Sequence, residues 1–365
     1  MNDQARTDVI RVAMIGTGWA GETALKHFRT LPNVEVVALA DTVETRLNTL
    51  GHTYGISHLY TDYEELLAQE QDLDAVSIAA PNFMHAPIVL AALRRGVHVL
   101  CEKPLARTSE EAATLVEAAR EAKRILQVVF NHRERGDVQL LKQYIDEGNL
   151  GNIYYAKAYW MRRRGVPGAH SWFVNKELAG GGPLIDLGVH VLDMALFLLN
   201  EPSTVSVSAS TYSELGRRGL GINTNSIKFG TDNHFNVEDL ATAFIRLQNG
   251  TTLLLETSWA THSSAQDDYG VVLYGTEGGA EIRVVNYATE DTLRIYTNII
   301  GQPATIQPAV PPSTFHLAVI KEFIRRITSG DWSQYDGSDG LRRARIIDAC
   351  YASALEGREV LLNVE

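Results

Sequence analysis

The sequence has 365 residues, 45% of them hydrophobic and 21% charged, which is enough for two globular domains with sizeable cores. Its net charge of −11 and pI near 5.5 argue against a nucleic acid or an anionic membrane surface as partner. The two cysteines, Cys101 and Cys350, form no disulfide framework, which suits a reducing compartment. Neither an apolar N-terminal segment nor a run of about 18 apolar residues is found. We therefore expect a cytoplasmic protein.

The first third of the chain alternates apolar strands with amphipathic helices, the pattern of a doubly wound parallel sheet. We expect strands at residues 10–16, 34–41, 74–81, 98–104 and 124–132. The helices that alternate with them are expected at 21–31, 62–69, 84–96 and 109–123, the last with Ser109 as its N-cap. These elements define a first domain over residues 1–130.

From residue 131 onward, apolar and polar residues alternate with period two, which is typical of antiparallel strands. After a helix at 138–148, we expect strands at 153–161, 204–211, 240–260 and 269–284, with Asn249-Gly250 as a hairpin turn in the third segment. Helices at 313–329 and 340–356 end the chain. The fold class is therefore α/β, with a parallel sheet in the first domain and a mainly antiparallel sheet in a second, α/β domain over residues 131–365.

The motif GTGWAG places Gly16, Gly18 and Gly21 in the G-x-G-x-x-G spacing, between the first strand and the first helix. Such a turn lets a pyrophosphate approach backbone amides at the positive end of a helix. The residues expected to contact the cofactor here are Gly16, Thr17, Gly18, Trp19 and Ala20. The motif predicts that residues 1–130 form a Rossmann domain that binds a dinucleotide.

Asp41 follows the second strand, 20 residues past Gly21. Its carboxylate would accept hydrogen bonds from the adenosine ribose hydroxyls and repel a 2′-phosphate, so NAD is favoured over NADP. Arg46 either lies over the adenine or is a surface charge on a helix.

Two further strand ends carry candidate residues, at Pro81 and at Glu102-Lys103-Pro104. Ligands bind at the carboxyl ends of parallel strands, so Lys103 is well placed to share a proton or donate to a substrate oxygen beside the nicotinamide. A surface ion pair with Glu102 is the alternative. The candidates for cofactor contact in this region are Pro81, Asn82, His85, Glu102 and Lys103, although His85 is more often a packing residue in such a position.

The apolar segment LIDLGVHVLDM, residues 184–194, carries Asp186, His190 and Asp193 on one face of a predicted helix. Buried charges are costly unless they are paired or line a polar cleft. Because histidines titrate near neutral pH, His190 is the candidate base, with Asp186 orienting its ring or binding a hydroxyl. Asp193 is either a partner of the site or a solvated residue. The spacing lacks a strong third ligand, so no metal is expected, while a structural network without catalysis is the alternative.

The dinucleotide motif, EKP at 102–104 and GGGPLIDLGVHVLDM at 180–194 together resemble the Gfo/Idh/MocA oxidoreductases, the glucose-fructose oxidoreductase and inositol dehydrogenase group. The resemblance spans nearly the whole chain, including VEDLATAFIRLQNGTTLLLE at 237–256. It implies an open sheet in the C-terminal domain, a homodimer or homotetramer built on that sheet, and catalytic roles for Lys103, Asp186 and His190. It also implies a reaction at one secondary alcohol of a sugar or cyclitol ring. The run at 161–182 resembles the subgroup that acts on pyranosides and on anhydrosugars such as levoglucosan.

Substrate contacts are expected near the junction of the domains and along the candidate helix. The candidates are Lys103, Asn131, Arg133, Arg164, Trp172, Asp186 and His190. Asn131, His132 and Arg133 follow the last strand of the first domain, and Trp172 is either a platform for a sugar ring or a plain core residue. Residues 162–164 are three arginines that contact cofactor or substrate, or else form ion pairs. The irregular segment 213–236 is an active-site or interface loop, or disordered decoration.

Three classes of function fit these residues. The first is an NAD-dependent dehydrogenase that oxidises a secondary hydroxyl of a sugar, anhydrosugar or cyclitol to a ketone, with Lys103 and His190 converging on one oxygen. The second is an NAD-dependent glycosidase that oxidises its sugar only transiently and accumulates no NADH. The third is a non-catalytic regulator that senses dinucleotide or sugar, against which the intact Lys103, Asp186 and His190 argue.

Overall fold

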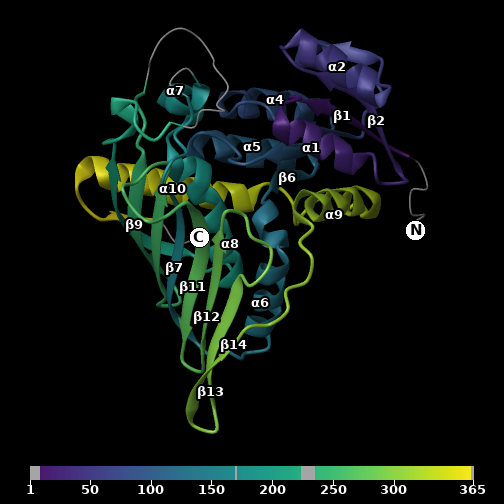
Figure 1. Cartoon of the computed structure of the whole chain (residues 1–365). Helices are drawn as coiled ribbons and strands as arrows, with labels where there is room; N and C mark the ends of the chain where they lie inside the picture. The colour runs from purple at the N-terminus through teal and green to yellow at the C-terminus, as the bar shows by residue number, and fades with distance from the viewer. Residues whose placement is uncertain (1–8, 169–170, 223–234, 363–365) are drawn as a thin grey trace. The chain divides into compact units, whose positions relative to one another are not determined.

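A computed structural model describes residues 9–168, 171–222 and 235–362 (Figure 1). These residues form two compact units. Unit 1 consists of the described residues up to Asn131 together with Phe315–Ala344, and unit 2 consists of His132–Thr314 together with the described residues from Arg345 onward. The first boundary lies next to the predicted one at residue 130. Residues 315–344, which we expected in the second domain, group with unit 1.

Unit 1 is built on a sheet of six parallel strands. The strands are β1 (Ile10–Ile15), β2 (Val34–Ala40), β3 (His58–Tyr60), β4 (Ala75–Ile78), β5 (His98–Glu102) and β6 (Leu126–Val129). They lie in the order β3-β2-β1-β4-β5-β6, which confirms the doubly wound parallel sheet. The direction of winding reverses between β1 and β4, and in such sheets the ligand binds at the carboxyl ends of the strands beside this point.

Helices cover both faces of this sheet. They are α1 (Trp19–Phe28), α2 (Glu44–Tyr54), α3 (Tyr63–Gln69), α4 (Asn82–Arg94), α5 (Ser109–Ala122), α9 (Phe315–Ser329) and α10 (Ser338–Glu356), the last of which continues into unit 2. The sequence pattern missed α2 and β3, because α2 is largely polar and β3 has only three residues. The N-cap of α5 is Thr108, whose side chain accepts a hydrogen bond from the Glu111 amide, rather than Ser109, which is the first helical residue.

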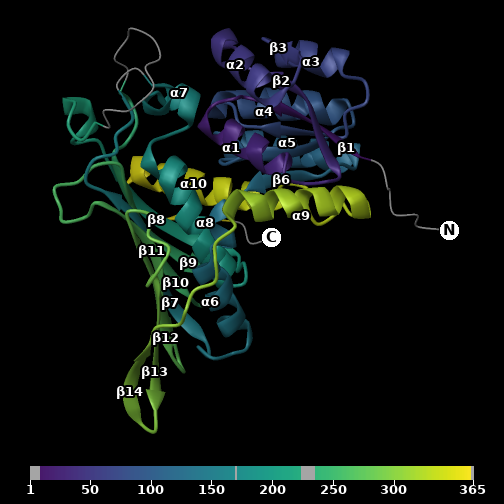
Figure 2. The same cartoon turned by 45° about the vertical axis from the view of Figure 1, so that its right-hand side comes forward.

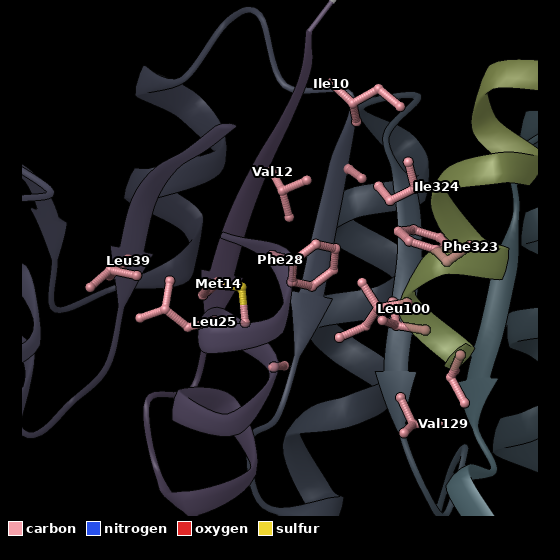
Figure 3. Packing of buried hydrophobic residues seen from close by; sticks show 14 of the residues in the cluster. Ile10, Val12, Met14, Leu25, Phe28, Leu39, Leu100, Val129, Phe323 and Ile324 are labelled. Atoms are coloured by element: carbon pink, nitrogen blue, oxygen red, sulfur yellow. The ribbon is translucent and has the colours of Figure 1, made fainter. Parts of the chain in front are cut away.

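Helix α9 belongs to unit 1 because its apolar face completes the core of that unit. Phe323 and Ile324 of α9 pack in one cluster with Phe28 of α1 and Leu100 of β5 (Figure 3). The Phe323 side chain is fully buried, which stabilises the fold by roughly 1.5–3 kcal/mol. A helix near the end of the chain therefore supplies part of the N-terminal core.

Unit 2 contains a sheet of nine strands. The strands are β7 (Ile153–Arg162), β8 (Thr204–Tyr212), β9 (Leu240–Leu247), β10 (Thr252–Ser258), β11 (Asp267–Gly275), β12 (Gly279–Val285), β13 (Leu293–Ile299), β14 (Gln302–Ile306) and β15 (Val360–Leu361). Their order is β14-β13-β12-β11-β7-β10-β9-β8-β15, and only β7 and β10 pair in parallel. The mainly antiparallel sheet is confirmed, and Gly250, with φ +86°, forms the predicted hairpin turn between β9 and β10. The β13–β14 hairpin was not predicted.

The helical segments of unit 2 include two helices that pack on one face of the sheet, α6 and α8 (Figure 2). The segments are the 3-10 turns η1 (Asn131–Glu134), η2 (Trp172–Val174) and η4 (Gly216–Arg218), the helices α6 (Gly136–Asp146), α7 (Lys176–Ala179) and α8 (Val189–Leu198), and the π-helical turn η3 (Leu184–Gly188). The predicted helix over 184–194 is therefore a π turn that continues as an α-helix. π turns occur frequently at functional sites.

The stretch Lys176–Leu198 is long and apolar enough, by composition alone, to cross a membrane. In the folded protein, 89% of its most apolar window is buried. Packing of α8 against β7 and β11 accounts for this apolar character.

Candidate active site

The turn between β1 and α1 has the form that a dinucleotide requires. Gly16 has φ +90°, and a Cβ there would lie 2.5 Å from the Ala79 carbonyl oxygen, so only glycine fits. At Gly21 a Cβ would meet the Gly16 carbonyl oxygen at 2.0 Å. Around Gly18, by contrast, no described atom lies within 4 Å of where a Cβ would be. The backbone at the start of α1 is therefore open to a pyrophosphate, and these residues fit NAD.

Asp41 is held firmly at the end of β2. Its carboxylate accepts hydrogen bonds from the amide and hydroxyl of Thr17, both at 2.7 Å, from the Val43 amide at 2.8 Å and from the Arg46 guanidinium at 2.8 Å. Burial alone would raise the pKa of this carboxyl group, but the bonds from Arg46 and Thr17 outweigh it, so the pKa is lowered. A ribose hydroxyl would have to displace one of these donors, and the Arg46 side chain, at 37% exposure, is accessible from solvent.

The other predicted cofactor residues lie around the same end of the sheet. Trp19 is the first residue of α1 and is 78% exposed, while Ala20 beside it is half-buried. Pro81 caps the N-terminus of α4, and Asn82 begins that helix as a buried residue.

His85 is enclosed in the protein, with an exposure of 1%. Its Nδ1 lies 2.8 Å from the carbonyl oxygen of Pro104, and its Nε2 lies 2.9 Å from that of Ala80. Burial lowers the pKa of the ring, although both carbonyl oxygens act in the opposite direction. His85 thus ties the loop after β4 to the loop after β5, and this arrangement favours the packing interpretation over direct cofactor contact.

Lys103 follows β5, is half-buried and precedes a cis peptide bond to Pro104. Near it, Glu102 Oε1 lies 3.6 Å from Nε2 of His316, a residue of α9 that the sequence interpretation missed. The ring of His316 also lies edge-on to that of Trp19, with centroids 6.3 Å apart, and its ring nitrogens lie 3.4 and 3.5 Å from Nδ2 of Asn131. His316 follows β5 by more than 200 residues, and its surroundings in sequence carry no motif that could have revealed it.

In unit 2, the π turn carries Asp186 and α8 carries His190 one turn later. The Asp186 carboxylate accepts a 3.0 Å hydrogen bond from the indole nitrogen of Trp259, which is fully buried. The ring of His190 lies 4.7 Å from that of His132 and 5.6 Å from that of Trp160, centroid to centroid. The predicted base, His190, and Asp186 are thus held one helical turn apart, against aromatic side chains that include Trp160 of β7 and the buried Trp259.

The start of the π turn is held by Glu238, which the sequence interpretation did not single out. Its buried carboxylate accepts hydrogen bonds from the amides of Gly182 at 2.9 Å and Leu184 at 3.1 Å, and from the Tyr351 hydroxyl at 2.9 Å. Burial raises the pKa of Glu238, and the amide bonds oppose this without overcoming it. A Cβ at Gly182 would lie 2.1 Å from the Glu238 carbonyl oxygen, and one at Gly181 would lie 1.9 Å from the Tyr351 hydroxyl. The glycines are therefore required by close packing.

Two predicted residues of this region form an ion pair with each other. Arg133 donates to both oxygens of Asp193, from Nε at 2.8 Å and from Nη2 at 2.5 Å, and Asp193 is only 1% exposed. Asp193 is therefore a buried partner rather than a solvated residue, and it engages the guanidinium that we expected to bind substrate.

The remaining candidates are less closely connected to this face. Arg164 is exposed, and Trp172 is half-buried and stacked on Phe173 with ring centroids 3.9 Å apart. Of the segment 213–236, residues 223–234 lie outside the described residues. Its first part forms a 3-10 turn at Gly216–Arg218, anchored by the carboxylate of Asp239, which accepts the amides of Leu215 and Gly216. Lys103 belongs to unit 1, and Asp186 and His190 belong to unit 2, so their convergence on one oxygen stays a prediction.

A dinucleotide cradle in one unit, and a candidate base with a neighbouring carboxylate on one helical face in the other, define a nicotinamide-dependent oxidoreductase. Comparison with known proteins agrees, because residues 10–130 match the model of an oxidoreductase family with an NAD-binding Rossmann fold, and residues 138–281 match the GFO/IDH/MocA C-terminal domain. The chain belongs to the Gfo/Idh/MocA oxidoreductase family.

Known relatives and a solved structure match between 78% and 99% of the chain. The chain is 33% identical over 369 residues to the D-glucoside 3-dehydrogenase of Escherichia coli (strain K12), covering 99% of the chain and 100% of the relative. It is 31% identical over 305 residues to a levoglucosan dehydrogenase of Pseudarthrobacter phenanthrenivorans, covering 78% of the chain and 76% of the relative. A levoglucosan dehydrogenase solved with NADH and L-sorbose has the same fold, with a TM-score of 0.85 at 24% identity over 98% of this chain and 100% of that one.

Proposed function

We propose that the protein is an NAD-dependent dehydrogenase that oxidises one secondary hydroxyl of a sugar, anhydrosugar or cyclitol ring to a ketone. The observation that carries this proposal is the placement of Asp186 and His190 one turn apart on one helical face, in a chain with an NAD-binding domain. The full-length similarity to a D-glucoside 3-dehydrogenase supports a glycoside as the first substrate to test.

The proposed roles follow from what the reaction requires. The ring carbon loses a hydrogen with both electrons of its C–H bond, and the hydroxyl on that carbon loses its proton, so a C=O bond forms. Bound NAD⁺ supplies the acceptor for the hydride. We assign the hydroxyl proton to His190, and we assign the hydrogen bond that holds the substrate oxygen to Lys103. Asp186, fixed by Trp259, orients the substrate hydroxyl and the imidazole.

The cofactor is assigned to the carboxyl ends of the strands in unit 1. Gly16, Gly18 and the start of α1 would hold its pyrophosphate, and Asp41 would bind its ribose hydroxyls. We assign the exposed Trp19 and the half-buried Lys103 to contacts with the nicotinamide end of the cofactor.

The same proposal covers the location and oligomeric state of the protein and the roles of its two domains. We expect a cytoplasmic homodimer or homotetramer, as the family resemblance implies, and light scattering of the purified protein measures its mass. We also expect residues 1–130 and 131–365 to act as the cofactor and substrate domains, with α9 contributing to the core of the first.

The proposal is tested by mixing the protein with NAD⁺ and a panel of monosaccharides, glycosides, anhydrosugars and inositols, and following NADH at 340 nm, where NADH absorbs and NAD⁺ does not. We expect NADH with at least one uncharged ring substrate, together with an equal amount of ketone. Absence of NADH across the panel would contradict the proposed dehydrogenase.

A further inference from the structure

Three side chains from neighbouring strands meet beside the candidate helix of unit 2. Arg162 ends β7, Asp267 begins β11, and Tyr287 lies in the turn that follows β12. Arg162 donates from Nε to Asp267 at 2.9 Å and from Nη2 to the Tyr287 hydroxyl at 2.8 Å. The second oxygen of Asp267 accepts the indole N–H of Trp160 at 2.7 Å, so the carboxylate is fixed on both sides.

This cluster adjoins the predicted base, His190, and the neighbouring Asp186. The guanidinium carbon of Arg162 lies 5.3 Å from the centre of the Trp160 ring, and that ring lies 5.6 Å from the ring of His190. Burial lowers the pKa of Arg162, but Tyr287 and Asp267, with a smaller contribution from Asp186, outweigh it, so the pKa is raised. The Asp186 carboxylate that we assign to the reaction is thus one of the negative charges that act on Arg162.

The cluster retains hydrogen-bonding capacity. A guanidinium has five N–H groups, and Nε and Nη2 of Arg162 each use one in the bonds described. Its Nη1 makes no hydrogen bond to any described residue. Because this atom is not one of the buried polar atoms that lack a partner, it is accessible to a ligand. Tyr287 is 53% exposed, so its ring and hydroxyl are accessible from solvent.

The backbone that presents Tyr287 is unusual. Asn286 and Tyr287 have φ of 51° and 60°, in the left-handed region that residues other than glycine rarely occupy. Such conformations persist where the surrounding structure enforces them, and they concentrate at functional sites. The Asn286 amide donates to the Asp267 carbonyl oxygen at 2.9 Å, which ties the turn to β11.

We propose that Arg162 and Tyr287 form a subsite that binds the hydroxyl groups of an uncharged pyranose next to the carbon that is oxidised at Asp186 and His190. These residues position the ring and select its class, and they take no part in the proton or hydride transfer. The proposal rests on the proposed function. It assigns the substrate contact to Arg162, within the run of three arginines, instead of to the exposed Arg164.

The charges of the subsite determine which sugars it accepts. The positive charge of Arg162 is balanced by Asp267, and Asp186 adds a negative charge nearby. A site for sugar phosphates or uronates needs unbalanced positive charge. Alternating donors and acceptors without net positive charge suit neutral hydroxyls.

The first test replaces Tyr287 by Phe, which removes the hydroxyl and keeps the ring, with Tyr274→Phe as the control because Tyr274 is an exposed tyrosine elsewhere on the same sheet. Binding of the substrate glycoside to the NADH-bound protein is measured by calorimetry, and kcat and KM are measured by NADH formation. We expect Tyr287→Phe to raise Kd and KM by roughly 5-fold to 10-fold, the value of one hydrogen bond, with kcat within about twofold.

Monodeoxy analogues of the same glycoside show whether the lost contact is made to the sugar. The Tyr287→Phe penalty should vanish for the one analogue that lacks the contacted hydroxyl and persist for the others. A penalty of the same size for every analogue, or none for the parent sugar, would overturn the proposal.

A second variant keeps the proposal testable if the first alters the turn. Arg162→Lys keeps the charge but loses the planar fork, so it should also raise KM and Kd, whereas the exposed Arg294→Lys should not. The wild type should use a neutral glucoside at least ~10-fold better than the corresponding glucuronide, and equal use of both would contradict the charge argument. If the wild type forms no NADH with any sugar, the proposed function fails; if it does and both variants behave like the wild type, only the subsite fails.

Discussion

The indole nitrogen of Trp259 donates a 3.0 Å hydrogen bond to Oδ2 of Asp186. Trp259 is fully buried directly after β10, whereas Asp186 lies in the π turn. This bond joins the sheet to the helical face that carries the candidate base, and it fixes one carboxylate oxygen in place. The geometry of the site thus depends on a residue 73 positions away in sequence.

Replacing Trp259 by Phe tests that connection. The variant loses the indole N–H and keeps an aromatic ring, so Asp186 loses a donor to a charged group, a bond that contributes about 1.5–3 kcal/mol. We expect kcat to fall by roughly 10-fold or more, with little change in the Kd for NAD⁺. Trp332→Phe, the same substitution in unit 1, serves as the control. A Trp259→Phe variant with wild-type kcat would show that the bond does not serve catalysis.

Replacing His190 by Ala tests the assignment of the base. Loss of a general base typically lowers the rate by about 10²-fold to 10⁴-fold. NAD⁺ affinity, measured by fluorescence titration, should stay within about twofold because the cradle lies in unit 1. Unaltered turnover would remove the assignment.

Replacing Asp41 by Ala tests how the ribose is recognised. The variant should bind NAD⁺ roughly 10-fold more weakly, since it loses a charged acceptor. It should also gain affinity for NADP⁺, because Arg46 would lose its carboxylate partner and could pair with a 2′-phosphate. The double variant Asp41→Ala/Arg46→Ala should lose that gain. An unchanged preference for NAD⁺ in Asp41→Ala would mean that another group reads the ribose.

Glu238 is expected to position the π turn without touching substrate. Glu238→Ala leaves the amides of Gly182 and Leu184 without their acceptor, which costs about 1–3 kcal/mol of stability per buried group. Tyr351→Phe removes only one of the bonds to this carboxylate and should cost less, about 1 kcal/mol. Thermal unfolding measures both effects. A purely structural role would change stability alone, whereas a positioning role also lowers kcat in the milder Tyr351→Phe variant.

The carboxyl group of Glu322 on α9 is expected to make the free energy of unfolding depend on pH in the acid range. Hydrogen bonds from Arg325, opposed by partial burial and reinforced by Arg326, lower the pKa of Glu322 from 4.5 to about 2. A carboxyl group with a lowered pKa in the folded state stabilises the protein above its ordinary pKa, and this contribution is lost as the pH falls from 4.5 to about 2. After allowance for solvent screening, we expect ionised Glu322 to contribute about 1 kcal/mol to the free energy of unfolding at neutral pH.

The measurement compares urea unfolding of the wild type and Glu322→Gln across this pH range. The difference in stability should be constant above about pH 5 and shrink toward zero near pH 2. Glu117→Gln, a change at an exposed position of α5, is the matched control. A difference that does not narrow in acid would show that the carboxylate charge contributes nothing.

The sequence was most informative where local pattern and local chemistry coincide. Strand-helix alternation and the glycine spacing predicted the parallel sheet and the dinucleotide turn, because both depend on short segments. The Asn249-Gly250 turn was predicted for the same reason. Helix α2 was not predicted because its apolar face is narrow. Helix α9 was assigned to the second domain because the residues it packs against, such as Phe28 and Leu100, lie far away in the chain.

The candidate site was predicted only in part, for a similar reason. Helical spacing placed Asp186 and His190 on one face, but it could not identify their neighbours from the sheet. Glu238 lies in the segment 237–256 that carries the family resemblance, but no local pattern marks its role or those of Trp259 and His316, and only the tertiary fold brings each to its partner. Arg133 was chosen for its position in the chain, which gave no indication that its guanidinium pairs with Asp193.

The central claim is that a ring carbon of an uncharged sugar transfers its hydrogen to NAD⁺ as hydride, and that the sugar is released as a ketone. The most direct measurement uses the active glycoside deuterated at the oxidised carbon and follows the deuterium by mass spectrometry. We predict one deuterium in each NADH, and one ketone for each NADH formed. Release of free sugar without accumulation of NADH would identify a redox-assisted glycosidase and would contradict the claim, as would deuterium that appears in water and not in NADH.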